Sequence, residues 1–196
     1  MKVSDYIAGV VGRFNPFVVQ GGAAVHMIDS LQRGGHRYVC CAHEQAAGFA
    51  ADGYAKVMGL GVAVTTCGPG ATNLLTAAAS AYFERVPVLY LVGQQHGFQE
   101  LDLPAIFKEV THCALRVSDP NTLRGALDVA LFTAQKARGP VLLNIFDEVY
   151  RADIPHKSTA VMPNPYQPPR SELIFAKKRA SLPTEMDWTE TKTVNP

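Results

Sequence analysis

Residues 61–93 read GVAVTTCGPGATNLLTAAASAYFERVPVLYLVG, and this stretch decides the expected fold. Its two ends, 61–67 and 86–93, are short apolar runs rich in β-branched residues, which is typical of buried strands. The alanine-rich middle, 70–85, indicates a helix. Because a helix is the usual connection between neighbouring parallel strands, the stretch predicts a parallel sheet.

The same alternation of strands and helices continues on both sides of this unit. Ser4 is expected to cap a first helix that buries Ile7, Val10 and Val11. Further helices are expected at 24–31, 44–58 and 121–137, and further strands at 17–19, 37–41, 114–117 and 141–146. We therefore expect a three-layer α/β/α fold with a central, mostly parallel sheet, whose ligands bind at the carboxyl ends of the strands.

The alternating pattern ends near Ile154. Seven of the 13 prolines lie between Pro155 and Pro196, where no helix or strand period is visible. Such a composition favours a linker or tail over a second folded unit. We expect one domain over 1–154 and a Pro-rich linker or tail over 155–196.

Composition excludes several classes of function. The 196 residues carry 18 basic and 17 acidic side chains, a net charge of +1, so no nucleic-acid or anionic-membrane surface is expected. No apolar run is long enough to span a membrane, and Asp5 lies where a signal peptide would be apolar, which favours a cytoplasmic location. The scattered cysteines are expected to be buried, unpaired thiols, and no metal site is expected.

The loop from Gly68 to Asn73 follows a strand and opens a helix, which is a common place for ligands. As a dinucleotide-binding motif it is incomplete, because Asn73 stands at the third glycine position and the strand 88–92 does not end in an acidic residue. A nucleotide-binding domain is therefore a weak alternative, and a simple tight turn is another.

Glu44 follows a strand and begins an apolar helix. It has two interpretations: an acid in the first turn that interacts favourably with the helix dipole, or a carboxyl at an interface that shares a proton with a ligand. These residues alone favour the first interpretation, because acids at helix starts are common.

The motifs and their order resemble those of a known family. That family is the N-terminal, pyrimidine-binding domain of thiamine-diphosphate enzymes, and the nearest branch is the large subunit of acetolactate synthase. The resemblance extends from about Lys2 to Ile154. It is carried by the segments Gln20–Ala23, His43–Ala47, Phe49–Ala55, Gly68–Asn73, Gly93–Gln94 and Phe98–Glu100.

The resemblance implies roles for particular residues. Glu44 matches the glutamate that hydrogen-bonds N1′ of the coenzyme's aminopyrimidine, and Gln99 matches a glutamine near the reacting centre, so both are candidate catalytic residues. The candidate cofactor-binding residues, besides Glu44, are Gly21, Gly22, Pro69, Gly70, Asn73 and Phe98.

The family's diphosphate-binding domain, which holds Mg²⁺, has no counterpart in the sequence. The chain is therefore expected to be one half of a 2-keto acid decarboxylase or carboligase, a lyase or transferase that needs a partner chain with the other half. It would form a homo- or hetero-oligomer, be inactive alone and expose an apolar face. The alternative is a non-catalytic, truncated remnant or interaction module.

Three positions depart from the pattern of the family. Gln20 stands where proline is usual, the loop between Gln95 and Phe98 is several residues shorter, and Phe146 replaces the usual Ile-Pro. The shorter loop weakens any assignment of the substrate.

Overall fold

A six-stranded sheet forms the centre of the computed structural model, which describes residues 1–97 and 99–154. The strand order is β2-β1-β3-β4-β6-β5, and every neighbouring pair is parallel. The bounds are β1 Phe17–Val18, β2 Val39–Cys40, β3 Gly61–Thr65, β4 Val88–Gln94, β5 Cys113–Val117 and β6 Val141–Phe146. The expected parallel sheet is confirmed.

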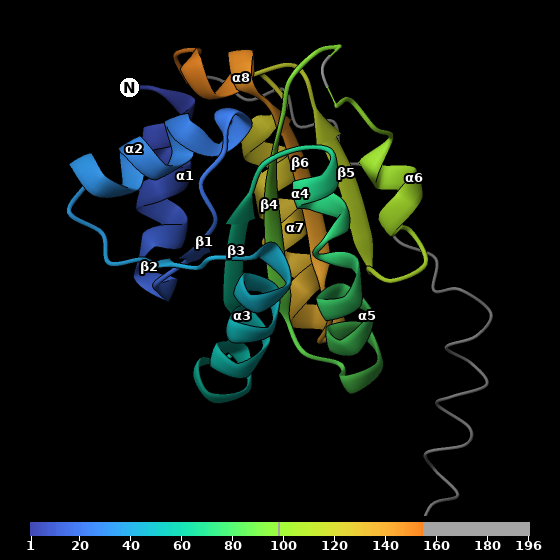
Figure 1. Ribbon diagram of the computed structural model, residues 1–196. Helices are drawn as coiled ribbons and strands as arrows, with labels where there is room; N and C mark the ends of the chain where they lie inside the picture. The colour runs from blue at the N-terminus through green and yellow to red at the C-terminus, as the bar shows by residue number, and fades with distance from the viewer. Residues whose placement is uncertain (98, 155–196) are drawn as a thin grey trace, which may run out of the picture. The chain divides into compact units, whose positions relative to one another are not determined.

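Helices cover both faces of this sheet (Figure 1). One face is covered by α1 (Val3–Val11), α2 (Val25–Arg33), α7 (Leu123–Ala137) and α8 (Asp147–Arg151). The other is covered by α3 (Glu44–Met58), α4 (Pro69–Thr72), α5 (Leu75–Glu84) and α6 (Leu103–Phe107). Two 3₁₀ turns, Gly12–Phe14 and Gly22–Ala24, complete the elements, and the three-layer fold is confirmed.

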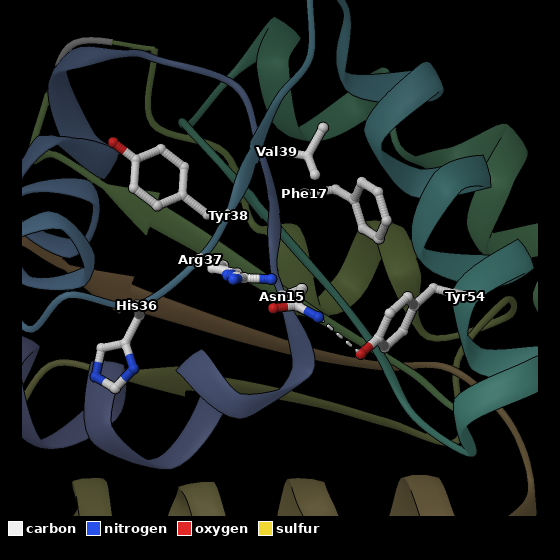
Figure 2. A pocket seen from close by; sticks show the side chains of 7 residues that line it. All are labelled: Asn15, Phe17, His36, Arg37, Tyr38, Val39 and Tyr54. Atoms are coloured by element: carbon white, nitrogen blue, oxygen red, sulfur yellow. Dashed lines mark hydrogen bonds between the residues drawn. The ribbon is translucent and has the colours of Figure 1, made fainter.

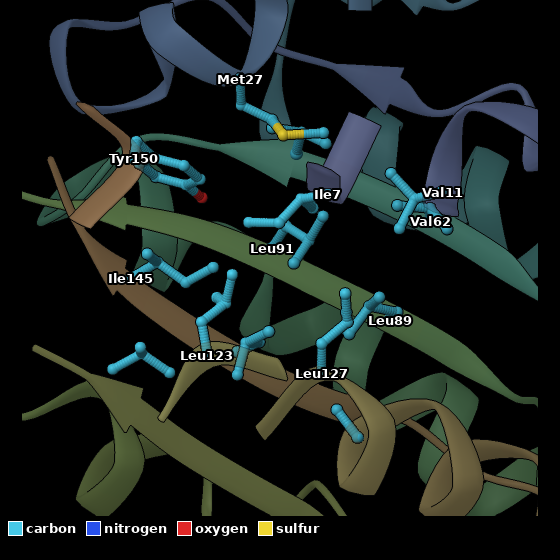
Figure 3. Close-up of a cluster of buried hydrophobic side chains, with 14 of the residues drawn as sticks. Ile7, Val11, Met27, Val62, Leu89, Leu91, Leu123, Leu127, Ile145 and Tyr150 are labelled. Atoms are coloured by element: carbon cyan, nitrogen blue, oxygen red, sulfur yellow. The ribbon is translucent and has the colours of Figure 1, made fainter. Parts of the chain in front are cut away.

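The side chains of the strands contribute to two separate apolar cores, because successive side chains of a strand point to opposite faces of the sheet. On β3, Val62 and Val64 enter the core beneath α1, α2 and α7 (Figure 3), whereas Ala63 enters the core beneath α3 and α5. Strands β3 and β4 are buried along their whole length. This explains their continuous apolar runs.

Some local expectations were wrong. The first helix begins at Val3, so Ser4 is not its cap; Ser4 is buried inside the helix and accepts a hydrogen bond from the Ser30 hydroxyl at 2.9 Å. Val10 is only half-buried.

The helix expected at 70–85 is divided into α4 and α5. At the junction the backbone tightens, because the Leu74 amide donates to the carbonyl of Ala71, three residues back, at 3.0 Å. The short helices α6 and α8 were not predicted.

The expectation of buried thiols also needs correction. All four cysteines are free, but only Cys67 is buried, and Cys40 is exposed on the edge strand β2. No helix in the described ranges is long and apolar enough to cross a membrane. The predicted tail at 155–196 lies outside the described residues.

Candidate active site

The loops that follow β1, β3 and β4 approach one another closely at the carboxyl edge of the sheet. A Cβ atom built on Gly21 would lie 2.5 Å from Cβ of Thr66, and one on Gly93 would collide with the carbonyl of Ala23. The Ala23 amide also donates to the Thr66 hydroxyl at 3.3 Å. Glycine at positions 21 and 93 therefore allows three strand ends to meet.

Glu44 is the first residue of α3, which begins directly after the turn that leaves β2. The helix is capped by His43, whose Nδ1 accepts a hydrogen bond from the Gln45 amide at 3.1 Å. This cap fixes the direction in which the helix enters the site. The Glu44 side chain is half-buried and lies at the surface of the chain.

One oxygen of the Glu44 carboxylate is held by Asn73. The Asn73 side-chain amide donates from Nδ2 to Oε2 of Glu44 at 2.8 Å, across 29 residues of sequence. Within the described part of the chain, no hydrogen bond to the other oxygen, Oε1, is seen. The arrangement therefore orients the carboxyl and leaves Oε1 available to a ligand.

Gly70 leaves room for that oxygen. A Cβ atom at this position would lie 3.1 Å from Oε1 of Glu44 and 2.8 Å from Cγ2 of Thr66. Gly70 belongs to α4, where Pro69 occupies the first turn. Pro69, the residue before Gly70, is exposed.

Gln99 lies against the same loop from the other side. It adopts a left-handed backbone conformation, with φ of 54°, and a Cβ on Gly68 would lie 3.2 Å from its Oε1 atom. Gly68 also has a positive φ, 57°, so an alanine there would be strained as well as crowded. Gln99 is exposed, and Phe98 lies outside the described residues.

The two glycines at 21 and 22 reach the site indirectly. Gly21 contacts Thr66, which also borders Gly70, and a Cβ on Gly22 would lie 3.6 Å from Nε2 of Gln95. Neither glycine contacts the Glu44 side chain itself. Of the residues expected in the site, Glu44, Gly70 and Asn73 thus form a direct cluster, and Gln99 and Gly21 border it.

Thr66 was missed by sequence reasoning, although it lies between Gly21, Ala23 and Gly70. The available signal was its position: a hydroxyl-bearing, β-branched residue at the carboxyl end of a buried strand.

The short loop after β4 is anchored by a second group that was missed. The His96 ring stacks on Phe146 with 4.2 Å between the ring centroids, and its Nε2 lies 2.9 Å from Oε1 of Glu148. The Gly97 amide donates to the Glu100 carboxylate at 2.9 Å. Two departures from the family pattern, the shortened loop and Phe146, are therefore in contact with each other.

Comparison with known proteins agrees with the family resemblance expected from the motifs. Residues 1–112 match the family model described as "Thiamine pyrophosphate enzyme, N-terminal TPP binding domain". The acetolactate synthase large subunit of Corynebacterium glutamicum is 40% identical over 148 residues, which are 70% of this chain and 24% of that protein. Isozyme 2 of the Escherichia coli large subunit is 36% identical over 148 residues, 69% of this chain and 26% of that protein.

A relative whose name gives a different activity matches as well. The sulfoacetaldehyde acetyltransferase of Rhodobacter capsulatus is 29% identical over 161 residues, 76% of this chain and 27% of that protein. The chain thus spans about a quarter of the length of these relatives.

Proposed function

This chain belongs to the thiamine pyrophosphate enzymes as a carrier of their N-terminal TPP-binding domain, and we propose that it supplies the pyrimidine-binding half of a 2-keto acid decarboxylase or carboligase. The proposed reaction is of the acetolactate synthase kind, because relatives with that name are 35–40% identical to it. Bound thiamine diphosphate supplies a carbon nucleophile and an electron sink for cleaving the bond beside a keto group.

The observation that carries this proposal is the geometry of Glu44. Its Oε2 accepts from the Asn73 amide at 2.8 Å, so a proton on this carboxyl resides on Oε1. That oxygen lies close to Gly70, where a Cβ atom would be 3.1 Å from it, and we propose that it meets a ring nitrogen of the coenzyme. Glu44 therefore holds and donates a proton at Oε1, and Asn73 fixes which oxygen carries it.

The neighbouring residues place backbone and amide groups around the Glu44 carboxylate. Gly70 has no side chain to occupy the gap, and the exposed Gln99 amide lies over Gly68 at its border. We propose that the role of Gln99 is to position polar groups at the reacting centre. Gly21, Gly22 and Pro69 shape the surrounding backbone, and Phe98 adjoins Gln99 in the sequence.

The proposal includes a partner chain. Mg²⁺ and the diphosphate require a set of oxygen ligands, and the part of the chain that the structure describes brings no such group of acidic side chains together. We therefore assign them to a diphosphate-binding domain on another chain, in a homo- or hetero-oligomer in the cytoplasm. The chain alone is expected to be inactive.

An apolar stripe on α3 supports this assembly. Ala46, Phe49, Gly53 and Val57 recur three or four residues apart and are all exposed, with 43% of Phe49 and 83% of Val57 accessible to solvent. Exposed apolar surface of this kind marks a place where another protein binds. The stripe begins two residues beyond Glu44, so a partner that covers it would also close the site.

The test is reconstitution. The full chain is copurified from its source cells with any protein that carries the diphosphate-binding domain, and CO₂ release from pyruvate is measured with thiamine diphosphate and Mg²⁺. We expect activity from the pair and none from the chain alone. Glu44→Gln should lower the rate at least about 100-fold, whereas the control Glu109→Gln, in the exposed turn that follows α6, should not change it.

A pair that stays equally active with Glu44→Gln would overturn the assigned role. A second candidate function, a non-catalytic remnant or interaction module, is favoured by the limited coverage of the relatives, about a quarter of their length. Binding of a partner without any activity would support that alternative.

A further inference from the structure

A hollow lies near the amino ends of β1 and β2, whereas Glu44 follows the carboxyl end of β2. Its volume is about 540 Å³, which is in the usual range for sites of small molecules. It is lined by residues that precede or begin β1 and β2, together with Tyr54 from the second half of α3. We propose that this cavity binds a small planar carboxylate, that is, a flat ring or conjugated skeleton bearing one negative charge.

The walls of the cavity suit a flat apolar skeleton. The rings of Phe17 and Tyr54 meet edge to face, with 5.9 Å between their centroids, and Val39 completes the wall (Figure 2). Val39 is 47% exposed, so a ligand here would cover apolar surface that water now contacts. Aromatic edges and faces favour planar partners.

A hydrogen-bond donor faces the same space. The Asn15 side chain donates from Nδ2 to the Tyr54 hydroxyl at 3.1 Å, drawn as a dashed line in Figure 2. Because the hydroxyl oxygen already accepts this bond, its own proton is available to an acceptor such as a carboxylate.

The charge of the cavity is positive. Arg37 is exposed, and in the described ranges it makes no hydrogen bond, ion pair or ring contact. In Figure 2 its side chain extends toward Asn15 and Tyr54. No acidic residue lines the cavity, so the guanidinium has no counter-charge there. A planar guanidinium matches the geometry of a carboxylate, which it can bind through two parallel hydrogen bonds.

The cavity is formed before any ligand arrives. Asn15 has φ of 45°, and its amide donates to the carbonyl of Gly12 at 3.2 Å. The His36 ring fits between two glycines, because a Cβ on Gly12 would collide with it and one on Gly34 would lie 2.7 Å from its Cδ2. These contacts fix the turn at Asn15 and the residue that precedes Arg37, so little order has to be gained on binding.

The test uses the full chain, labelled with ¹⁵N, and benzoate as the probe. Two-dimensional NMR titration should show shifts at the amides of Phe17, Arg37 and Tyr54. Benzamide has the same ring without the charge, and acetate has the charge without the ring. Both are expected to bind at least about tenfold more weakly than benzoate.

Variants identify the groups responsible. Arg37→Gln should weaken benzoate binding at least about tenfold, and Tyr54→Phe, which keeps the ring, severalfold. Arg138→Gln removes another exposed arginine, at the end of α7, and should leave the affinity unchanged. A dispersed amide spectrum verifies that each variant is folded.

Three results would overturn the proposal: equal binding of benzoate and benzamide, an affinity that Arg37→Gln leaves within about twofold, or shifts confined to the loop 66–73. The proposal is independent of the coenzyme, so Glu44→Gln should not alter benzoate binding. Failure here therefore leaves the proposed function untouched, and the reverse also holds.

Discussion

At the scale of single residues, the candidate site depends on positions where a side chain is absent. Gly70 leaves the space that Oε1 of Glu44 faces, and Gly21 lets β1 approach Thr66. Each glycine lies at a strand end or in the helix turn that follows it, where the backbones of separate elements meet. Such close approach admits no larger residue without movement of its neighbours.

A substitution at Gly70 tests this directly. We expect Gly70→Ala to lower the free energy of unfolding by about 1–3 kcal/mol, because its methyl group would lie 2.8 Å from Cγ2 of Thr66 and 3.1 Å from Oε1 of Glu44. Urea denaturation measures the change. The matched control is Gly53→Ala in α3.

No atom lies within 4 Å of a Cβ built on Gly53, so alanine there should raise the free energy of unfolding by about 0.5–1 kcal/mol through helix propensity. If both substitutions stabilise the chain equally, the Gly70 gap is not constrained by its neighbours.

At the scale of elements, α3 and α5 are joined by an ion-pair group around Lys56. Its ammonium lies 2.7 Å from the buried Asp52 carboxylate and 2.6 Å from Oε2 of Glu84 on α5. The hydrogen bond from Lys56 lowers the pKa of Glu84 below its ordinary value. This group of ion pairs holds α3 and α5, the two helices that border the candidate site, to each other.

This pair predicts a pH dependence of stability. Because the pKa of Glu84 is lower in the folded chain than in the unfolded chain, its contribution is present above about pH 4.5 and is lost as the pH falls through the folded-state value. We expect Glu84→Gln to lower the urea midpoint at pH 7 and to have a progressively smaller effect as the pH falls below about 4.5.

Glu109→Gln is the control, because that carboxylate is exposed and lies 3.9 Å from Lys108. Parallel curves of midpoint against pH for Glu84→Gln and the unchanged chain would contradict the prediction.

The helices and strands also show which features of the fold and of the site could be predicted from the sequence alone. The start of α3 at Glu44 was predicted because an alanine-rich, apolar segment follows a strand there, and the parallel sheet was predicted from its continuous apolar runs. The contact between Glu44 and Asn73 follows from the path of the chain through three elements, which no local pattern contains. The left-handed conformation of Gln99 is likewise set by its surroundings.

At the scale of the whole molecule, α3 carries exposed apolar side chains among the residues that the structure describes. The α3 stripe of Ala46, Phe49, Gly53 and Val57 is exposed although the helix packs firmly on the sheet through Ala47, Ala51 and Ala55. The stripe therefore lies outside the packed core of the described domain, as the proposed assembly with a partner chain requires.

A substitution in the stripe separates folding from assembly. Val57→Ser should leave the free energy of unfolding of the isolated chain within about 0.5 kcal/mol, because the side chain is 83% exposed, and should weaken association with the partner. Sedimentation velocity of the mixture measures association.

Phe132→Ser is the control, since Phe132 is 67% exposed on α7, which covers the other face of the sheet. Equal loss of association in both variants would show that the stripe has no special part in assembly.

Strand β2, the outermost strand on its side of the sheet, consists of only Val39 and Cys40. A strand this short has few free backbone N–H and C=O groups to which another polypeptide could bind and extend the sheet. Growth of fibrils by addition of strands at β2 is therefore disfavoured. The short strand β2 thereby makes polymerisation through this edge of the sheet less favourable.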